Sequence, residues 1–203
     1  MLIENVRMQK PKLCFYRNAF VLFAVFLFMC CTLAAQTTDS LFRYQPQIGW
    51  EVFRGEPTND TSAAMIATTI YVQAAKTSIW TGRIRFKTYA VMDQKASWVG
   101  AGFAIEPVLQ HEQRHFDIAE ICARALEAEL NQLKIFSIKS PLLHETVDKW
   151  LTNLEAMQKE YDAETKNGRD AAAQNAWNNR IREALVTSEA AKGKRKPADT
   201  KNK

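Results

Sequence analysis

Residues 109–120 read Leu-Gln-His-Glu-Gln-Arg-His-Phe-Asp-Ile-Ala-Glu, and this stretch decides both the fold class and the chemistry that the sequence suggests. His111 and His115 are four residues apart, so on a helix both rings lie on one side, about one turn apart. That spacing suits two ligands of a tetrahedral zinc ion. Glu112 follows the first histidine and could accept a proton from a zinc-activated water. The stretch therefore predicts a zinc-binding H-E-x-x-H helix.

Two ordinary histidines on a surface helix are the alternative to a metal site. The chain has only three histidines, so a chance H-E-x-x-H has a probability on the order of 1% or below. Helical phase also favours the metal site, because at about 100° per residue His115 lies at the edge of the apolar stripe and His111 just beyond it. We therefore expect a neighbouring element to cover both histidines.

The apolar pattern around this stretch has a period of 3.6 residues, which predicts one long amphipathic helix from residue 106 to about residue 136. Ser140-Pro141 is expected to end it, because proline cannot continue the hydrogen-bond ladder. Two further helices are expected over about 145–163 and 169–188. They are separated by Lys166-Asn167-Gly168, a typical stop signal.

The segment 41–102, before the long helix, has strand character. Within it Ile84 and Phe86 alternate with Arg83 and Arg85, which is the pattern of a half-buried strand. We interpret 82–91 as an exposed edge along which a peptide could lie extended. The predicted fold class is α+β, a small and mainly antiparallel sheet followed by the H-E-x-x-H helix and two more helices.

The first 35 residues have the features of a signal peptide. A basic segment precedes the apolar run 19–31, and Thr-Leu-Ala-Ala-Gln at 32–36 offers cleavage after Ala34 or Ala35. An uncleaved anchor is the alternative, but the run from 19 to 35 is shorter than the roughly 20 apolar residues that span a bilayer. We expect an exported chain without a membrane span, located in the periplasm, associated with the envelope or secreted.

Residues 36–188 are expected to form one domain, and the basic segment 189–203 is expected to be a disordered tail. Cys122 is the one cysteine of four that lies beyond residue 35, so no internal disulfide is expected. Without the basic residues of the first 35 positions and of the tail, the domain is close to neutral. That balance argues against nucleic acid as a partner.

The stretch 109–120 resembles the H-E-Q-x-H-F-D-I-A-E helix of a bacterial family described as secreted zinc-dependent proteases and also as a domain of unknown function. Residues 48–55 resemble its L-x-W-x-x-F-x-G segment, Ser97-Trp98 its Ser-Trp pair, and 161–168 its Y-D-x-x-T-x-H-G element. The resemblance implies a zincin-like domain over most of 36–188. It also implies hydrolysis of a peptide or protein substrate.

One position departs from the family pattern. Asn167 stands where the last element has histidine, and amide groups are poor zinc ligands. If the next helix returns antiparallel, residues near 167 come level with His115, whereas His144 stays at the turn, far from the zinc. The candidates for a third ligand are then Asp162, Glu164, Asn167 and Asp170. Asp162 is preferred because it is a carboxylate and matches the family's Tyr-Asp pair.

The sequence thus predicts an exported zinc metallopeptidase in which Zn²⁺ is bound by His111, His115 and Asp162. Glu112 is the expected catalytic base. The alternative is a catalytically weakened or inactive zincin-like envelope binding protein, which the departure at Asn167 favours. A purely structural helical protein without metal is the third possibility.

Overall fold

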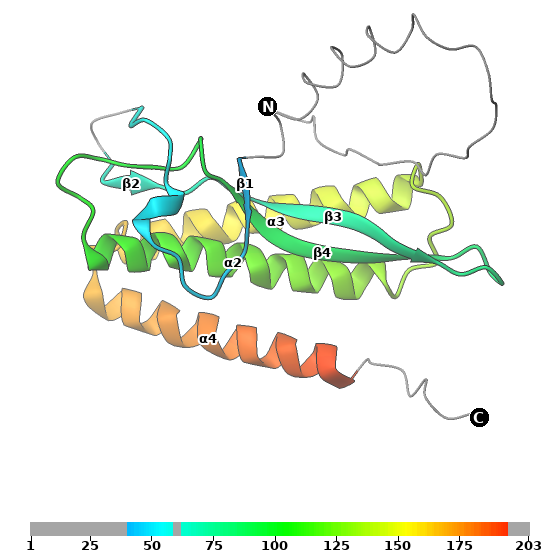
Figure 1. The fold of residues 1–203 in the computed structure, drawn as a ribbon. Helices are drawn as coiled ribbons and strands as arrows, with labels where there is room; N and C mark the ends of the chain where they lie inside the picture. The colour runs from blue at the N-terminus through cyan, green and yellow to red at the C-terminus, as the bar shows by residue number, and fades with distance from the viewer. Residues whose placement is uncertain (1–39, 59–61, 195–203) are drawn as a thin grey trace, which may run out of the picture. The chain divides into compact units, whose positions relative to one another are not determined.

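A computed structural model describes residues 40–58 and 62–194, and the side chains only as far as residue 190. The elements in chain order are β1 (Leu41–Arg43), the short 3-10 helix η1 (Trp50–Val52), β2 (Ala64–Met65), β3 (Thr68–Thr77), β4 (Ile84–Asp93), β5 (Trp98–Val99), α2 (Glu106–Leu130), α3 (Pro141–Thr165) and α4 (Ala171–Lys194) (Figure 1). The predicted α+β class is confirmed. The predicted signal peptide, 1–35, lies outside the described residues.

The main sheet has the strand order β1-β4-β3, and β2 pairs separately with β5. Strands β3 and β4 form a long antiparallel hairpin whose register runs from Thr68 opposite Met92 to Thr77 opposite Ile84. Along β4, Ile84 and Phe86 are buried while Arg85 is exposed, so the alternation read from the sequence is that of the folded strand.

Strand β1 pairs along part of the edge of β4 that faces away from β3, and side chains of α2 bond to backbone groups along that edge. The side chains of Glu120 and Glu127 accept hydrogen bonds from the backbone amides of Ala90 and Thr88, at 3.0 and 2.9 Å. Asn131 bonds both the amide and the carbonyl of Phe86. The interpretation of 82–91 as an exposed edge is therefore wrong, because β4 is the central strand and its outer backbone groups are already paired.

The ends of the helices differ from the expected ones. Helix α2 ends at Leu130 rather than near residue 136, because the Asn131 side chain is bound to β4 and a loop follows to Ser140. Pro141 begins α3 instead of breaking α2. Its missing amide is harmless at a first helical position, where an N–H would have no partner within the helix.

Helix α4 continues to Lys194, six residues beyond its expected end. Residues 189–192 read Glu-Ala-Ala-Lys, which are strong helix formers. Arg124 of α2 also pairs with Glu189, at 2.9 Å, and bonds the carbonyl of Leu185. The first part of the expected disordered tail is therefore helical, and 195–203 lie outside the described residues.

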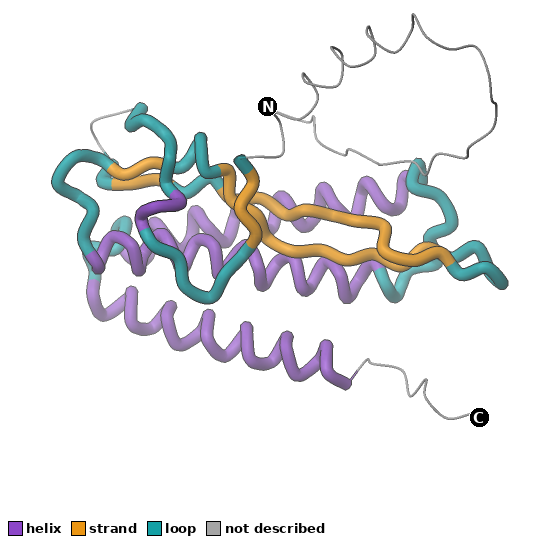
Figure 2. Tube along the Cα trace, in the orientation of Figure 1, coloured by secondary structure: helices purple, strands orange, loops and turns teal. Residues whose placement is uncertain are grey.

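The core lies around α2, which contacts β3 and β4 on one side and α3 and α4 on the others (Figure 2). The described residues from Phe42 onward belong to one compact unit, and the contacts described here lie within it. Phe116, Ala119 and Leu126 are fully buried. Over the described residues, no helix combines the length and apolar character that a membrane span requires.

Candidate metal centre

The candidate site forms where α2 and α3 pass each other. His111, Glu112 and His115 lie in the first turns of α2, and Asp162 lies in the last turn of α3. At the other end of the pair, Trp150 of α3 donates to Glu129 of α2. Helix α3 therefore returns antiparallel to α2, the condition on which the choice of third-ligand candidates depends.

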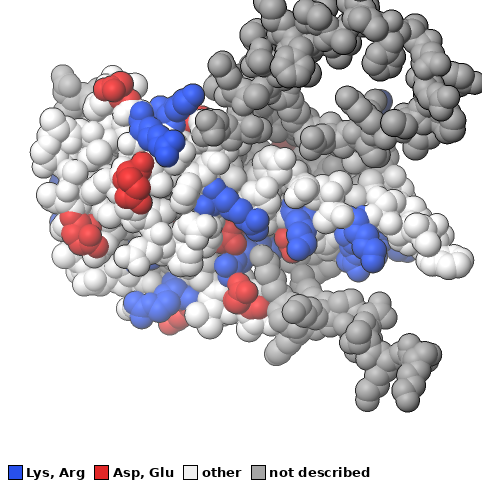
Figure 3. All heavy atoms as spheres, viewed as in Figure 1, with Lys and Arg blue, Asp and Glu red and all other residues white. Residues whose placement is uncertain are grey.

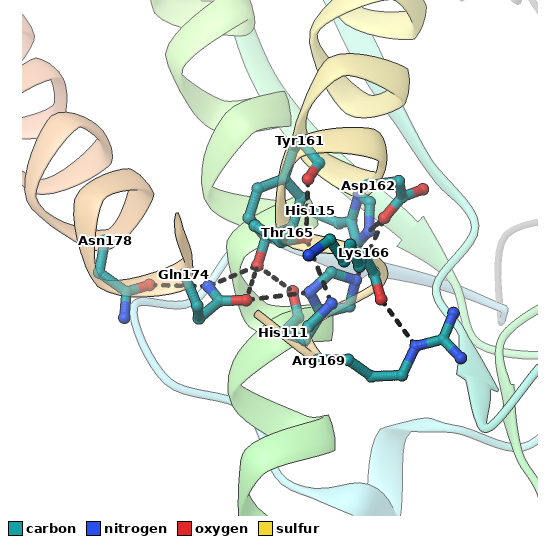
Figure 4. Close-up of polar contacts among 10 residues, drawn as sticks. His111, His115, Tyr161, Asp162, Thr165, Lys166, Arg169, Gln174 and Asn178 are labelled. Carbon is teal, nitrogen blue, oxygen red and sulfur yellow. Dashed lines mark hydrogen bonds and ion pairs between the residues drawn. The ribbon is translucent and has the colours of Figure 1, made fainter. Parts of the chain in front are cut away.

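Both imidazoles turn Nε2 toward one carboxylate oxygen. Asp162 Oδ1 lies 3.1 Å from His111 Nε2 and 2.9 Å from His115 Nε2 (Figure 4). One ligand atom from each of the three residues lies within 4.8 Å of the others. Ligands about 2.0–2.2 Å from a tetrahedral zinc ion stand roughly 3.3 Å apart, close to these distances. This group could hold a metal ion.

A residue from α4 sets the orientation of His111. His111 Nδ1 lies 3.2 Å from Gln174 Oε1, and an amide oxygen can only accept, so the ring proton belongs on Nδ1. The Nε2 lone pair of the neutral ring then faces the oxygen of Asp162. Two lone pairs at that distance require a cation between them, either a proton or a metal ion, so the donor set fits a metal.

Tyr161 contacts His111, His115 and Gln174. Its ring stacks on His111 with centroids 4.7 Å apart and meets His115 edge-on at 4.9 Å. Its hydroxyl accepts a hydrogen bond from Gln174 Nε2, at 2.7 Å. His115 Nδ1 is buried and has no hydrogen-bond partner among the described residues, so Nε2 is the nitrogen of His115 with a polar neighbour.

The carboxylate of Asp162 and the imidazole of His111 shift each other's pKa. Burial raises the pKa of Asp162, but its hydrogen bonds to His111 and His115 outweigh burial and hold that pKa well below its usual value. Burial lowers the pKa of His111, but the bond to Asp162 and further partners raise it overall. Asp162 is therefore a carboxylate beside two groups that stabilise its charge.

Glu112 is almost completely buried beside this group. Burial raises the pKa of its carboxyl, while His115 and His111 act in the opposite direction. The backbone amide of Ile66 donates to it. Solvent reaches the group mainly at Asp162, whose side chain is 39% exposed against 8% for His111 and 9% for His115.

Of the four candidates for a third ligand, Asp162 is the one that the structure places beside both histidines. Glu164 instead accepts a hydrogen bond from Trp177 Nε1, at 2.6 Å. Asp170 accepts from the amide of Ala173 at the start of α4. Asn167 is exposed, and its backbone amide donates to the carbonyl of Asp162.

Three residues that support His111 were missed as site residues. Tyr161 and Gly168 lie in the Y-D and N-G parts of the element at 161–168, so that motif carried a signal for both. Gln174 had none, because its role depends on how α4 packs against α2. His144 lies in the first turn of α3 and is not part of the group.

Gly168 adopts a left-handed conformation, φ +77°, and a Cβ there would lie 3.1 Å from His111 Cγ and Nδ1. Gly168→Ala is expected to lower the free energy of unfolding by more than the roughly 1–2 kcal/mol of left-handed strain alone, because the methyl group also displaces the imidazole. Gly102→Ala is the matched control, since Gly102 has φ +83° and a Cβ added there would meet no atom within 4 Å. Urea unfolding measures both, and equal losses would contradict close packing of Gly168 on His111.

Comparison with known proteins matched part of the chain to a family. Residues 85–169 match the model of a family described as "Bacterial protein of unknown function (DUF922)". The matched segment contains β4 except its first residue, together with β5, α2 and α3, and with them His111, Glu112, His115 and Asp162. Neither the curated proteins nor the solved structures gave a match. Over this segment the chain is similar to a bacterial family without a known activity, and the zinc-protease part of the resemblance remains a prediction.

Proposed function

We propose that this protein is a zinc-dependent metallopeptidase whose metal is held by His111, His115 and Asp162. The observation that carries the proposal is the convergence of two imidazole Nε2 atoms on one Asp162 oxygen. Glu112, next to the first histidine on the same helix, is the proposed general base. These four residues come from two helices that pack against each other, so the site is held by rigid elements.

The donor set favours zinc as the metal. Two imidazoles and a carboxylate are ligands that zinc commonly takes in catalytic sites, which keep a fourth position open for water or substrate. The partial exposure of Asp162 leaves a path for solvent to reach the group. Among the described residues the group consists of three side chains, and a site with three protein ligands supports a catalytic role over a structural one.

The side chains have separate tasks in the proposed reaction. When bound, zinc would lower the pKa of a water molecule and polarise the scissile carbonyl. Glu112 accepts a proton and later passes it to the leaving amine. Gln174 and Tyr161 fix the ring of His111, so Nε2 stays directed at Asp162.

A zincin-like binding protein with weak or no activity is the second candidate. The observation that favours it is Asn167, which stands where the family motif has histidine. Asn167 precedes Gly168, where an added Cβ would lie 3.1 Å from the His111 ring, so Asn167 borders the site. The amide of Asn167 is a poor metal ligand, so the site lacks the imidazole that the family motif has at this position.

Metal content and proteolysis measured on the same purified protein test the proposal. We expect about one zinc per chain and hydrolysis of an unfolded protein such as casein. Hydrolysis should stop with a chelator and return with added zinc. Zinc without hydrolysis would favour the binding protein, and metal-free protein from zinc-replete cells would refute the site.

We also propose that the protein is exported and cleaved after Ala34 or Ala35, so that it meets peptide or protein substrates outside the cytoplasm. The basic segment, the apolar run and the small residues before position 36 support this. Mass spectrometry of the protein from the envelope fraction should show a mature chain that begins at Ala35 or Gln36. An intact N-terminus in the membrane pellet would indicate an anchor instead.

A further inference from the structure

The turn between β3 and β4 exposes two large apolar side chains. Ile79 and Trp80 are each 90% exposed. Turns are usually built from Gly, Pro, Asn, Asp and Ser, so two bulky apolar residues there have no local structural role. Phe136 from the loop after α2 is 57% exposed and lies beside the same turn, near Gly82. Ile79, Trp80 and Phe136 are called the apolar tip below.

Hydrogen bonds hold the turn in place. The amide of Ser78 donates to the carbonyl of Arg83 at 2.9 Å, and the amide of Gly82 donates to the carbonyl of Ser78 at 2.8 Å. At its base, the amide of Ile84 donates to the carbonyl of Ile135, at 2.8 Å. The exposure of the tip is therefore imposed by an ordered backbone, and the hairpin extends past the end of α2 (Figure 1).

Basic residues flank the apolar tip in the sequence. The segments 76–87 and 131–140 contain no Asp or Glu. Their basic residues, called the basic collar below, are Lys76, Arg83, Arg85, Lys87, Lys134 and Lys139. None of these takes part in an ion pair within the described part of the chain. Lys and Arg gather along the hairpin, behind an end that carries no charge (Figure 3).

We propose that the apolar tip docks on the surface of an anionic lipid bilayer. Tryptophan prefers the interface between water and hydrocarbon, where its ring is buried and its N–H stays hydrated. The collar would meet headgroup phosphates, and a juxtamembrane Lys or Arg is attracted by an anionic surface. Apolar insertion and charge attraction are two weak signals that together give reversible binding.

The shape of the tip favours a lipid surface over a protein partner. Three side chains at the end of a hairpin cover far less than the roughly 800 Å² per partner of a typical stable protein interface. A bilayer, in contrast, can close around a protruding tip without a complementary pocket. The basic collar makes no ion pair within the described part of the chain, so it adds charge complementarity to a lipid surface rich in anionic headgroups.

The tip lies far from the metal group. Arg83 bonds the carbonyl of Asn131 just beyond the end of α2, and His115 precedes Asn131 by sixteen residues. Sixteen helical residues span about 24 Å. Changes at the tip should therefore leave zinc content and any hydrolysis unaltered, so this inference and the proposed function can fail separately.

The test uses the protein with the N-terminus that it has after purification from its host. It is mixed with vesicles of equal parts phosphatidylglycerol and phosphatidylcholine, or with vesicles of phosphatidylcholine alone. Brominated lipid quenches an inserted tryptophan. Trp98 and Trp177 are buried, and Trp50 and Trp150 are at most partly exposed, so Trp80 should dominate the quenching. We expect a blue shift and quenching with the anionic vesicles, both lost in Trp80→Phe while co-sedimentation persists.

Paired variants separate the two contributions. Ile79→Ser with Trp80→Ser should lower the partition coefficient by at least about tenfold. Lys76→Gln and Lys87→Gln should each lower binding to the anionic vesicles by about fivefold, with little effect on neutral ones. Val186→Ser removes an exposed apolar side chain on α4 and is the matched control that should change nothing. Circular dichroism verifies that each variant folds.

Two results would overturn the inference. One is Trp80 fluorescence that anionic vesicles leave unchanged, even if another segment of the chain binds the vesicles and makes the protein sediment with them. The other is self-association without lipid that the double serine variant abolishes, since the tip would then be covered by a second copy of the chain. Quenching that increases with the anionic lipid content and is lost in Trp80→Phe would support the proposed docking.

Discussion

Glu112→Gln is expected to reduce peptide hydrolysis by about 10²–10⁴-fold while the protein keeps its zinc. The amide has the shape of the carboxyl but cannot accept the proton that the reaction must remove. Glu112 lies outside the group of three ligand residues, so its replacement leaves the donor set intact. Steady-state hydrolysis and metal content, measured on the same preparation, give both numbers.

Stability is not expected to account for this loss. Glu112 is buried and receives the amide of Ile66, which the side-chain oxygen of glutamine can also accept. Glu106→Gln is the matched control, because Glu106 is an exposed glutamate in the first turn of the same helix. It should keep both zinc and activity. A Glu112→Gln protein that still hydrolyses peptides at the original rate would show that another group removes the proton.

The fold class could be predicted because its signals are local. The alternation of Ile84, Arg85 and Phe86 and the 3.6-residue period of α2 each arise within one element. Helix ends depend on contacts between elements. Asn131 ends α2 by bonding Phe86, which is 45 positions away in the sequence, and no periodicity within α2 shows that contact. Arg124 and Glu189 extend α4 in the same non-local way.

The candidate site also depends partly on local signals and partly on contacts between elements. His111 and His115 follow from spacing on a single helix, whereas Asp162 required the antiparallel return of α3. Counting residues from a break at Pro141 placed position 167 level with His115. The structure places Asp162 there, five residues earlier, because α2 ends at Leu130 and a ten-residue loop separates the helices.

Gln174 shows where sequence reasoning stops. It reaches both His111 and Tyr161 from the first turn of α4. Nothing in the pattern of α4 marks this glutamine as a site residue, since its position follows from the turn at 166–170. Contacts of this kind orient a metal ligand and are set by packing, which a single sequence does not display.

Asp162→Ala is expected to weaken zinc binding by more than about 100-fold. Loss of a residue that merely orients a ligand costs 10–100-fold, and a direct ligand should cost at least as much. Glu160→Gln removes an exposed carboxylate two positions earlier on the same helix and is the matched control for charge alone. Competition with a zinc chelator of known affinity measures both variants.

Asn167→His decides between the two candidate positions for the third ligand. If Asp162 is the ligand, the substitution should alter zinc affinity less than Asp162→Ala does, because the donor set is already complete. In the Asp162→Ala background, Asn167→His should then leave the zinc affinity low, since Asn167 is exposed in the turn after α3 and α3 places Asp162 directly between the imidazoles. Zinc binding by Asp162→Ala that matches the unaltered protein, together with tighter zinc binding by the double variant, would instead assign the third ligand to position 167. This chain would then be a weakened relative of the proteins whose motif has histidine there.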